Sequence, residues 1–128
     1  MEDRDAIANA RILVIDDEPD IRALLERILD SAGYEVALAA DGKEAVNQFR
    51  AKPANLVLTD LFMPHQEGLE TIMQLRKEFP RLAIIAMSGK TAGSRMLPIA
   101  QKLGAAVILE KPFAPQQLLD AVALALGT

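Results

Sequence analysis

The sequence predicts an α/β fold in which helices cover both faces of a doubly wound parallel sheet of five strands. Short apolar runs of strand length recur along the chain, separated by segments with helical spacing of apolar residues. The runs are apolar at consecutive positions, which is typical of parallel strands buried on both faces. With 128 residues, the chain has room for five strand–helix units in one domain and no room for a second.

Five apolar segments are the candidate strands. They are residues 12–15, 35–39, 55–59, 82–87 and 106–109. The second segment ends in Ala39 and Ala40 and places no polar group at its end, so we expect it at an edge of the sheet.

Four further segments carry the apolar stripe of an amphipathic helix. The stripes are Ile21, Leu24, Leu25, Ile28 and Leu29; Ala45, Val46 and Phe49; Leu69, Ile72, Met73 and Leu75; and Leu118, Leu119, Val122 and Leu126. Gly33 closes the first of these helices, and the pair Asp41–Gly42 opens the second. Pro115 suits the first turn of the last helix.

The segment from Lys90 to Ala105 is a weaker helix candidate. It contains Gly93 and Pro98, and a proline inside a helix removes a hydrogen bond and clashes with the preceding turn. We therefore predict a helix that starts late, near Leu97, with residues 89–96 outside it.

Composition excludes several function classes. The formal net charge is −4 with scattered Lys and Arg, and there is no Trp, one Tyr and four Phe, which argues against direct nucleic-acid binding. The absence of Cys excludes disulfides and thiolate sites. The N-terminus is acidic rather than signal-like, and the apolar runs are too short for membrane insertion. We expect a cytoplasmic protein.

Polar side chains follow four of the five predicted strands. Asp16 and Asp17 follow the first, Asp60 the third, Ser88 the fourth and Lys111 the fifth. Ligands of open parallel sheets bind at the carboxyl ends of the strands, so these side chains should meet at one edge. The acidic run alone could be a helix N-terminus with favourable charges, but that does not explain its convergence with the other residues.

This combination of groups has a specific chemistry. Two carboxylates about 5 Å apart repel by about 3 kcal/mol at an effective dielectric of 20, so the cluster calls for a cation. Oxygen ligands suit a hard ion such as Mg²⁺. A metal ion, an ammonium and a hydroxyl around one carboxylate can receive a phosphoryl group and form an aspartyl phosphate.

From Arg11 to Leu126 the sequence resembles the receiver domain of two-component response regulators. The resemblance rests on the apolar run before Asp16–Asp17, the segment DLFMPHQEG at 60–68, Ser88, and KPF at 111–113. It implies a flavodoxin-like sheet of order 2-1-3-4-5 with five helices. A single receiver domain would span residues 1–128, with its core at about 11–126.

The resemblance also implies roles for the site residues. Asp60 would accept the phosphoryl group from a histidine kinase or a histidine phosphotransfer protein. Asp17 and Asp60 would bind Mg²⁺ directly, together with the backbone carbonyl of Phe62, and Asp16 would act mostly through water. Ser88 and Lys111 would bind the phosphoryl oxygens, and the bond before Pro112 would be cis.

Phosphorylation would then draw Ser88 inward and repack the face of the fourth helix, fifth strand and fifth helix, where a downstream protein would bind. Met96, Leu97 and Ile108 are expected on this face. Ile108 departs from the family, in which an aromatic residue three positions before the lysine often reports the motion. The resemblance therefore does not extend to the usual aromatic switch in this chain.

Rival enzyme interpretations fail on single residues. The segment SGKT at 88–91 looks like the end of a nucleotide-binding P-loop, but Ile84 stands where that motif needs a glycine. A dehalogenase-type phosphatase would carry a second Asp at position 62, where Phe62 stands. We therefore expect no enzyme beyond self-phosphorylation and autodephosphorylation. A phosphate-independent interaction module and a receiver fragment of a longer regulator remain as alternatives.

Overall fold

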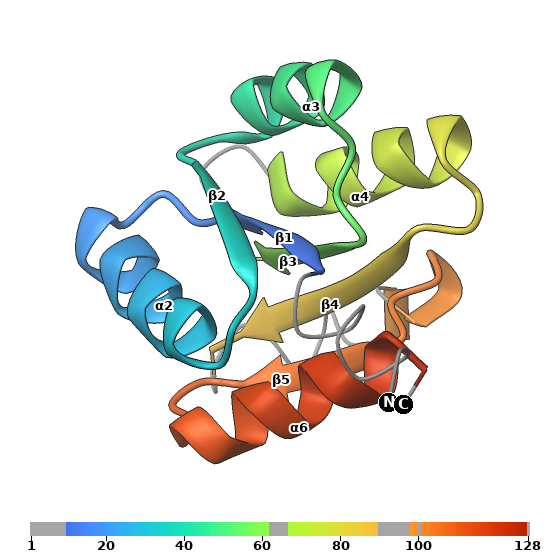
Figure 1. The fold of residues 1–128 in the computed structure, drawn as a ribbon. Coiled ribbons are helices and arrows are strands. Elements are labelled where there is room, and N and C mark those ends of the chain that lie inside the picture. Colours follow the sequence, from blue (N-terminus) through green and yellow to red (C-terminus); the bar gives the residue numbers. More distant parts are fainter. Residues whose placement is uncertain (1–9, 62–66, 90–97, 100, 128) are drawn as a thin grey trace.

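The computed structural model describes residues 10–61, 67–89, 98–99 and 101–127. Its centre is a parallel sheet with the strand order β2-β1-β3-β4-β5 (Figure 1). The strands are β1 (Arg11–Ile15), β2 (Glu35–Ala39), β3 (Leu56–Asp60), β4 (Ala83–Ser88) and β5 (Val107–Glu110). The predicted fold class and sheet order are confirmed, and β2 lies at an edge as expected.

Four long helices lie in the described part of the chain. They are α2 (Pro19–Ser31), α3 (Gly42–Ala51), α4 (Glu67–Glu78) and α6 (Pro115–Ala125). None of the helices in these ranges has the length and apolar character to cross a membrane.

The fifth predicted helix falls between β4 and β5, and only its later part is described. Pro98, Ile99, Gln101 and Lys102 are helical, and the N–H of Leu103 donates to the carbonyl of Ile99 at 3.0 Å. Pro98 therefore lies within helical backbone, as the sequence suggested. The predicted start at Leu97, and all of the preceding segment except Gly89, lie outside the described residues.

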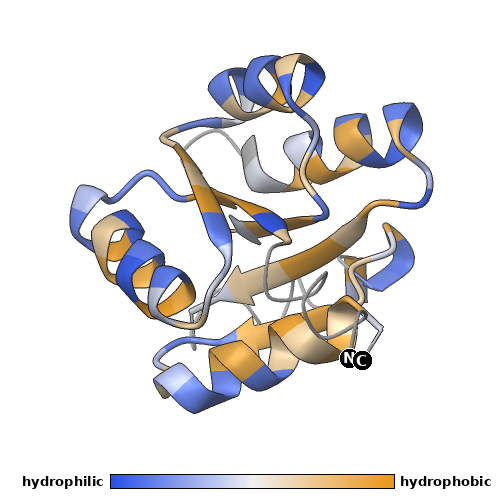
Figure 2. Cartoon of the chain, in the orientation of Figure 1, coloured by the Kyte–Doolittle hydropathy of each residue, from blue (hydrophilic) through white to orange (hydrophobic). Residues whose placement is uncertain are grey.

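The helices cover the sheet in two layers, α3 and α4 on one face and α2 and α6 on the other (Figure 1). Alternate strand residues serve the two layers: Leu13 and Ile15 pack with α3 and α4, whereas Ile12 and Val14 pack with α2 and α6. All four of these side chains are buried. This is why the strands are apolar at every position, and Figure 2 shows them as largely hydrophobic.

The predicted helix boundaries have clear physical causes. The Asp41 carboxylate caps α3 by accepting a hydrogen bond from the N–H of Glu44 at 2.8 Å. Gly33 follows α2 with a φ of 96°, a left-handed conformation that glycine adopts without strain. Pro115 is the first residue of α6, where its missing N–H costs no helical hydrogen bond.

The start of α4 packs directly on the end of β3 through Gly68. A Cβ atom added to Gly68 would collide with the main-chain oxygen of Asp60 and lie 2.8 Å from the Cα of Leu61. Both contacts are with backbone, which cannot rotate away as a side chain can. Gly68 therefore allows α4 to approach the strand end that carries Asp60.

We expect Gly68→Ala to lower the free energy of unfolding by about 1–3 kcal/mol because the added methyl group overpacks this contact. Helix propensity alone predicts the opposite sign, since alanine is favoured over glycine within a helix. Urea unfolding followed by circular dichroism measures the difference. Gly89→Ala is the matched control, because no described atom lies within 4 Å of its added Cβ. Equal unfolding free energies for the two variants would contradict the packing argument.

Candidate functional site

The carboxyl ends of the strands bring the predicted site residues together at one edge of the sheet. Carboxylate oxygens of Asp16, Asp17 and Asp60 all lie within 4.8 Å of one another. Ser88 ends β4, and its main-chain oxygen accepts a hydrogen bond from the N–H of Lys111 at 2.7 Å. The convergence expected from strand order is therefore present.

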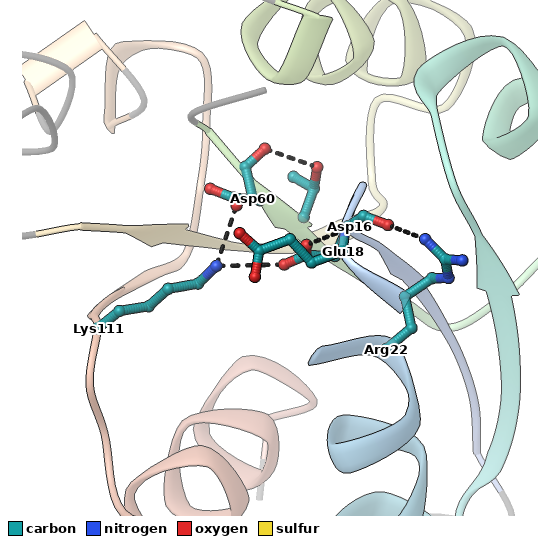
Figure 3. A network of polar contacts seen from close by, with 6 residues as sticks. Asp16, Glu18, Arg22, Asp60 and Lys111 are labelled. Carbon is teal, nitrogen blue, oxygen red and sulfur yellow. Dashed lines mark hydrogen bonds and ion pairs between the residues drawn. The ribbon is translucent and has the colours of Figure 1, made fainter. Parts of the chain in front are cut away.

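Lys111 joins the two buried carboxylates of the site (Figure 3). Its Nζ lies 3.2 Å from Oδ2 of Asp16 and 3.0 Å from Oδ2 of Asp60. Asp16 is 0% exposed and Asp60 is 6% exposed, so water can do little to stabilise either charge. The ammonium group is therefore the main cation in contact with them among the described residues.

Two opposing influences act on the pKa of Lys111. Burial is the largest and lowers the pKa, but the hydrogen bond and charge of Asp60, together with those of Asp16, outweigh it. The net pKa is raised above the ordinary value of 10.5. A group whose pKa is higher in the folded than in the unfolded state stabilises the fold fully below the unfolded value. This contribution is present at neutral pH and is lost only as the pH rises through the raised pKa.

Asp16 is held through all four of its polar groups. Its N–H donates to the carbonyl of Ala39 at 3.2 Å, and its main-chain oxygen accepts from Nη1 of Arg22 at 2.7 Å. Its Oδ1 accepts from the N–H of Glu18 at 2.9 Å, and its Oδ2 accepts from Lys111 at 3.2 Å. Asp16 is thus a fixed, buried anion.

Asp17 is the opposite case, although it is the next residue. Its side chain is exposed, and it makes no hydrogen bond or ion pair with any other residue that the structure describes. Its carboxylate is therefore available to a ligand at the same edge.

Ser88 carries a buried hydroxyl group without a hydrogen-bond partner among the described residues. The residue is 1% exposed, and a buried polar group in this state costs free energy unless a ligand or water satisfies it. Such a hydroxyl suits a ligand with oxygen atoms.

The donor set also fits a hard cation. Three carboxylates stand beside the single ammonium of Lys111, so negative charge is in excess in this cluster. Carboxylate oxygens are the ligands that Mg²⁺ prefers in proteins. The acidic triad can therefore hold such a metal ion.

The outcome for the remaining site predictions is mixed. The peptide bond between Lys111 and Pro112 is cis, as the resemblance implied. The predicted metal-binding carbonyl of Phe62 lies outside the described residues, as do Met96 and Leu97 of the predicted output face.

Sequence reasoning missed two residues at the site. Arg22 binds the main chain of Asp16, and the sequence offered no signal for that contact. The hydroxyl of buried Thr59 donates to the main-chain oxygen of Asp60 at 3.2 Å. For Thr59 a signal did exist, because it is the one polar residue between the apolar start of its strand and Asp60.

Comparison with known proteins identifies the family. The model of the response regulator receiver domain matches residues 12–123, and the chain belongs to this family. A receiver domain is a signalling module rather than an ordinary enzyme, and it implies a histidine kinase as partner. The pocket of Asp16, Asp17, Asp60 and Lys111 is consistent with phosphorylation of an aspartate.

Two similar curated proteins differ in how much of their own length the chain covers. Chemotaxis protein CheY of Thermotoga maritima is 34% identical over 113 residues, which cover 88% of this chain and 93% of that protein. The probable transcriptional regulator ycf27 of Porphyridium aerugineum is 41% identical, over 84% of this chain and 44% of that protein. The chain thus spans less than half the length of several curated relatives that it matches.

Solved structures show the same fold. A response regulator receiver domain from Clostridium thermocellum has a TM-score of 0.84 and 32% identity, over 91% of this chain and 94% of that one. The receiver domain of NtrX from Brucella abortus has a TM-score of 0.86 and 32% identity, over 91% of this chain and 98% of that one.

We expect Asp17→Asn to stabilise the metal-free protein by about 1 kcal/mol, because it removes one of three clustered charges at a site partly screened by water. The same change should abolish stabilisation by Mg²⁺, which for the native chain is about 2.7 kcal/mol at a concentration of 100 times the Kd. Urea unfolding with and without Mg²⁺ measures both effects.

Asp20→Asn serves as the control for Asp17→Asn, since Asp20 is also exposed and lies in the first turn of α2. Its response to Mg²⁺ should match that of the native chain. If the Asp17→Asn variant gained as much stability from Mg²⁺ as the native chain, Asp17 would not be a metal ligand.

Proposed function

We propose that this receiver domain is switched by phosphorylation of Asp60, with a histidine kinase or a histidine phosphotransfer protein as donor. The observation that carries the proposal is the position of the Asp60 carboxylate. It lies 3.0 Å from the ammonium of Lys111 and in one cluster with Asp16 and Asp17. An incoming phosphoryl group would thus meet a nucleophile beside a cation and a candidate metal site.

The proposed transfer is a displacement at phosphorus. A carboxylate oxygen of Asp60 attacks the phosphorus atom of a phosphohistidine, and the new O–P bond forms as the P–N bond breaks. The imidazole leaves with the electron pair of the broken bond and takes up a proton. Hydrolysis later returns the carboxylate and releases inorganic phosphate.

Asp17 and Asp60 are the proposed direct ligands of Mg²⁺, with the carbonyl of Phe62 as a third. The proposed role of Asp16 is indirect, through water. Support comes from its four protein contacts, which leave Asp16 less available than the exposed Asp17. When bound, Mg²⁺ would neutralise the charge that develops on the transferring group.

Ser88 and Lys111 are the proposed ligands of the phosphoryl oxygens. The unpartnered hydroxyl of Ser88 supports this role, because a phosphoryl oxygen would satisfy it. Lys111 carries its charge at neutral pH before the transfer, since Asp60 and Asp16 raise its pKa.

The proposed output is a change in the face built by the helix that includes Pro98, by β5 and by α6. The main-chain oxygen of Ser88 is bound to the N–H of Lys111, so movement of Ser88 would act on the end of β5. Ile108 lies in β5 opposite Ala86 of β4 and is partly buried. This face would contact a downstream protein, without direct nucleic-acid binding or membrane insertion, in the cytoplasm.

Incubation with acetyl phosphate and Mg²⁺ should add the mass of one phosphoryl group to the native chain and none to Asp60→Asn. Intact mass spectrometry measures the gain. Hydroxylamine should remove it, because it cleaves acyl phosphates and leaves phosphate esters intact. Asp41→Asn, a change at the N-cap of α3 that keeps a capping side chain, is the control and should be phosphorylated like the native chain.

A folded native chain that binds Mg²⁺ but gains no phosphoryl group would support the phosphate-independent interaction module instead. The observation that favours this interaction module is Ile108, which stands where the family usually has an aromatic residue.

Amide hydrogen exchange tests the proposed output face. Beryllofluoride, a mimic of the phosphoryl group, should change exchange at Leu109, Glu110 and Lys111, because Leu109 and Glu110 pair with Met87 and Ser88 at the end of β4 and the N–H of Lys111 donates to the main-chain oxygen of Ser88. The amides of α3 are the internal control and should exchange as before, since α3 lies over β1 and β2, on the side of the sheet away from the edge strand β5. Identical exchange with and without the mimic would show that this face does not respond.

A further inference from the structure

Arg22 makes a contact that the helix to which it belongs does not explain. It is the fourth residue of α2, and its guanidinium group turns back so that Nη1 donates to the main-chain oxygen of Asp16 at 2.7 Å (Figure 3). This is a short, charge-assisted hydrogen bond between the start of the helix and the end of β1.

The position is unfavourable for an arginine in general. The N-terminus of a helix carries partial positive charge, which favours acidic side chains and disfavours cations in the first turns. Glu18 and Asp20 follow that preference, whereas Arg22 does not. The contact with Asp16 offsets this cost.

The oxygen that Arg22 binds belongs to the peptide group that joins Asp16 to Asp17. A peptide group is planar, so fixing its oxygen restricts the plane from which the Asp17 side chain departs. Asp17 itself has no partner within the described residues, so only the backbone sets the direction of its carboxylate.

We propose that Arg22 is a positioning residue that holds the turn at residues 16–18 in the geometry that binds the metal ion. The inference depends on the proposed Mg²⁺ binding. Arg22 acts through the main chain and does not touch the metal or the phosphoryl group.

The positive charge of Arg22 and its positioning role have opposite effects on the metal. A cation close to the acidic triad repels Mg²⁺, so its removal strengthens metal binding if charge alone matters. Loss of the hydrogen bond frees the turn and weakens metal binding. The direction of the change in Mg²⁺ affinity on removal of Arg22 therefore distinguishes the effect of its charge from its positioning role.

Arg22→Met removes the donor and keeps a long side chain with good helix propensity. We expect its Mg²⁺ affinity, measured by calorimetry, to fall roughly 10- to 100-fold, as is usual when a residue that orients a metal ligand is lost. Arg22→Lys keeps the charge and one donor group, and its affinity should lie between those of Arg22→Met and the native chain. Arg27→Met, an equal loss of charge at an exposed position of α2, should bind Mg²⁺ at least as tightly as the native chain.

Amide exchange without metal gives a second, independent measurement. The N–H of Glu18 donates to Oδ1 of Asp16, so its exchange should be faster in Arg22→Met while exchange in β3 is unchanged. If the native chain binds no Mg²⁺, the proposed function fails, and the Glu18 amide still tests the contact itself. Native-like or tighter Mg²⁺ binding by Arg22→Met, or unchanged exchange at Glu18, would overturn the inference.

Discussion

The site depends on one interaction, the bridge that Lys111 makes between Asp16 and Asp60. The two carboxylates lie at the ends of the inner strands β1 and β3, and Asp16 is fully buried while Asp60 is 6% exposed. Without a cation, two such charges so close together would repel and would also lose their hydration. Because Lys111 follows β5, its side chain crosses the end of β4 to reach them. A single ammonium thus couples the centre of the sheet to its edge.

This bridge also explains why neighbouring aspartates behave differently. Lys111 and three further hydrogen bonds engage Asp16 completely, so it serves as a fixed part of the framework. Asp17 stays exposed and unengaged within the described residues. The same side-chain chemistry therefore supplies both a structural anion and an open ligand, and the two residues differ in burial and in their hydrogen bonds.

Strand positions and the clustering of Asp16, Asp60 and Lys111 were predictable because each apolar run ends where the chain leaves the buried sheet. The role of Arg22 was not predictable from the sequence. Its partner is a main-chain oxygen, and backbone atoms are the same at every residue. Gly68 belongs to the quoted segment 60–68, but its packing role was not predictable for a related reason, since that role lies in how closely α4 approaches β3. The apolar pattern of a sequence indicates which residues are buried. It does not indicate how closely two backbone segments approach each other.

The packing behind Asp60 has a mechanical consequence. The main chain of Asp60 is confined between the hydroxyl of Thr59 and the Cα of Gly68, in a central strand that is paired on both sides. β5, by contrast, pairs with one strand only, β4, among the residues that the structure describes. The main chain of Asp60 is therefore more closely confined on the side of α4 than the edge strand β5 is. If Asp60 is phosphorylated as proposed, we expect the structural response to be larger toward β5 than toward α4.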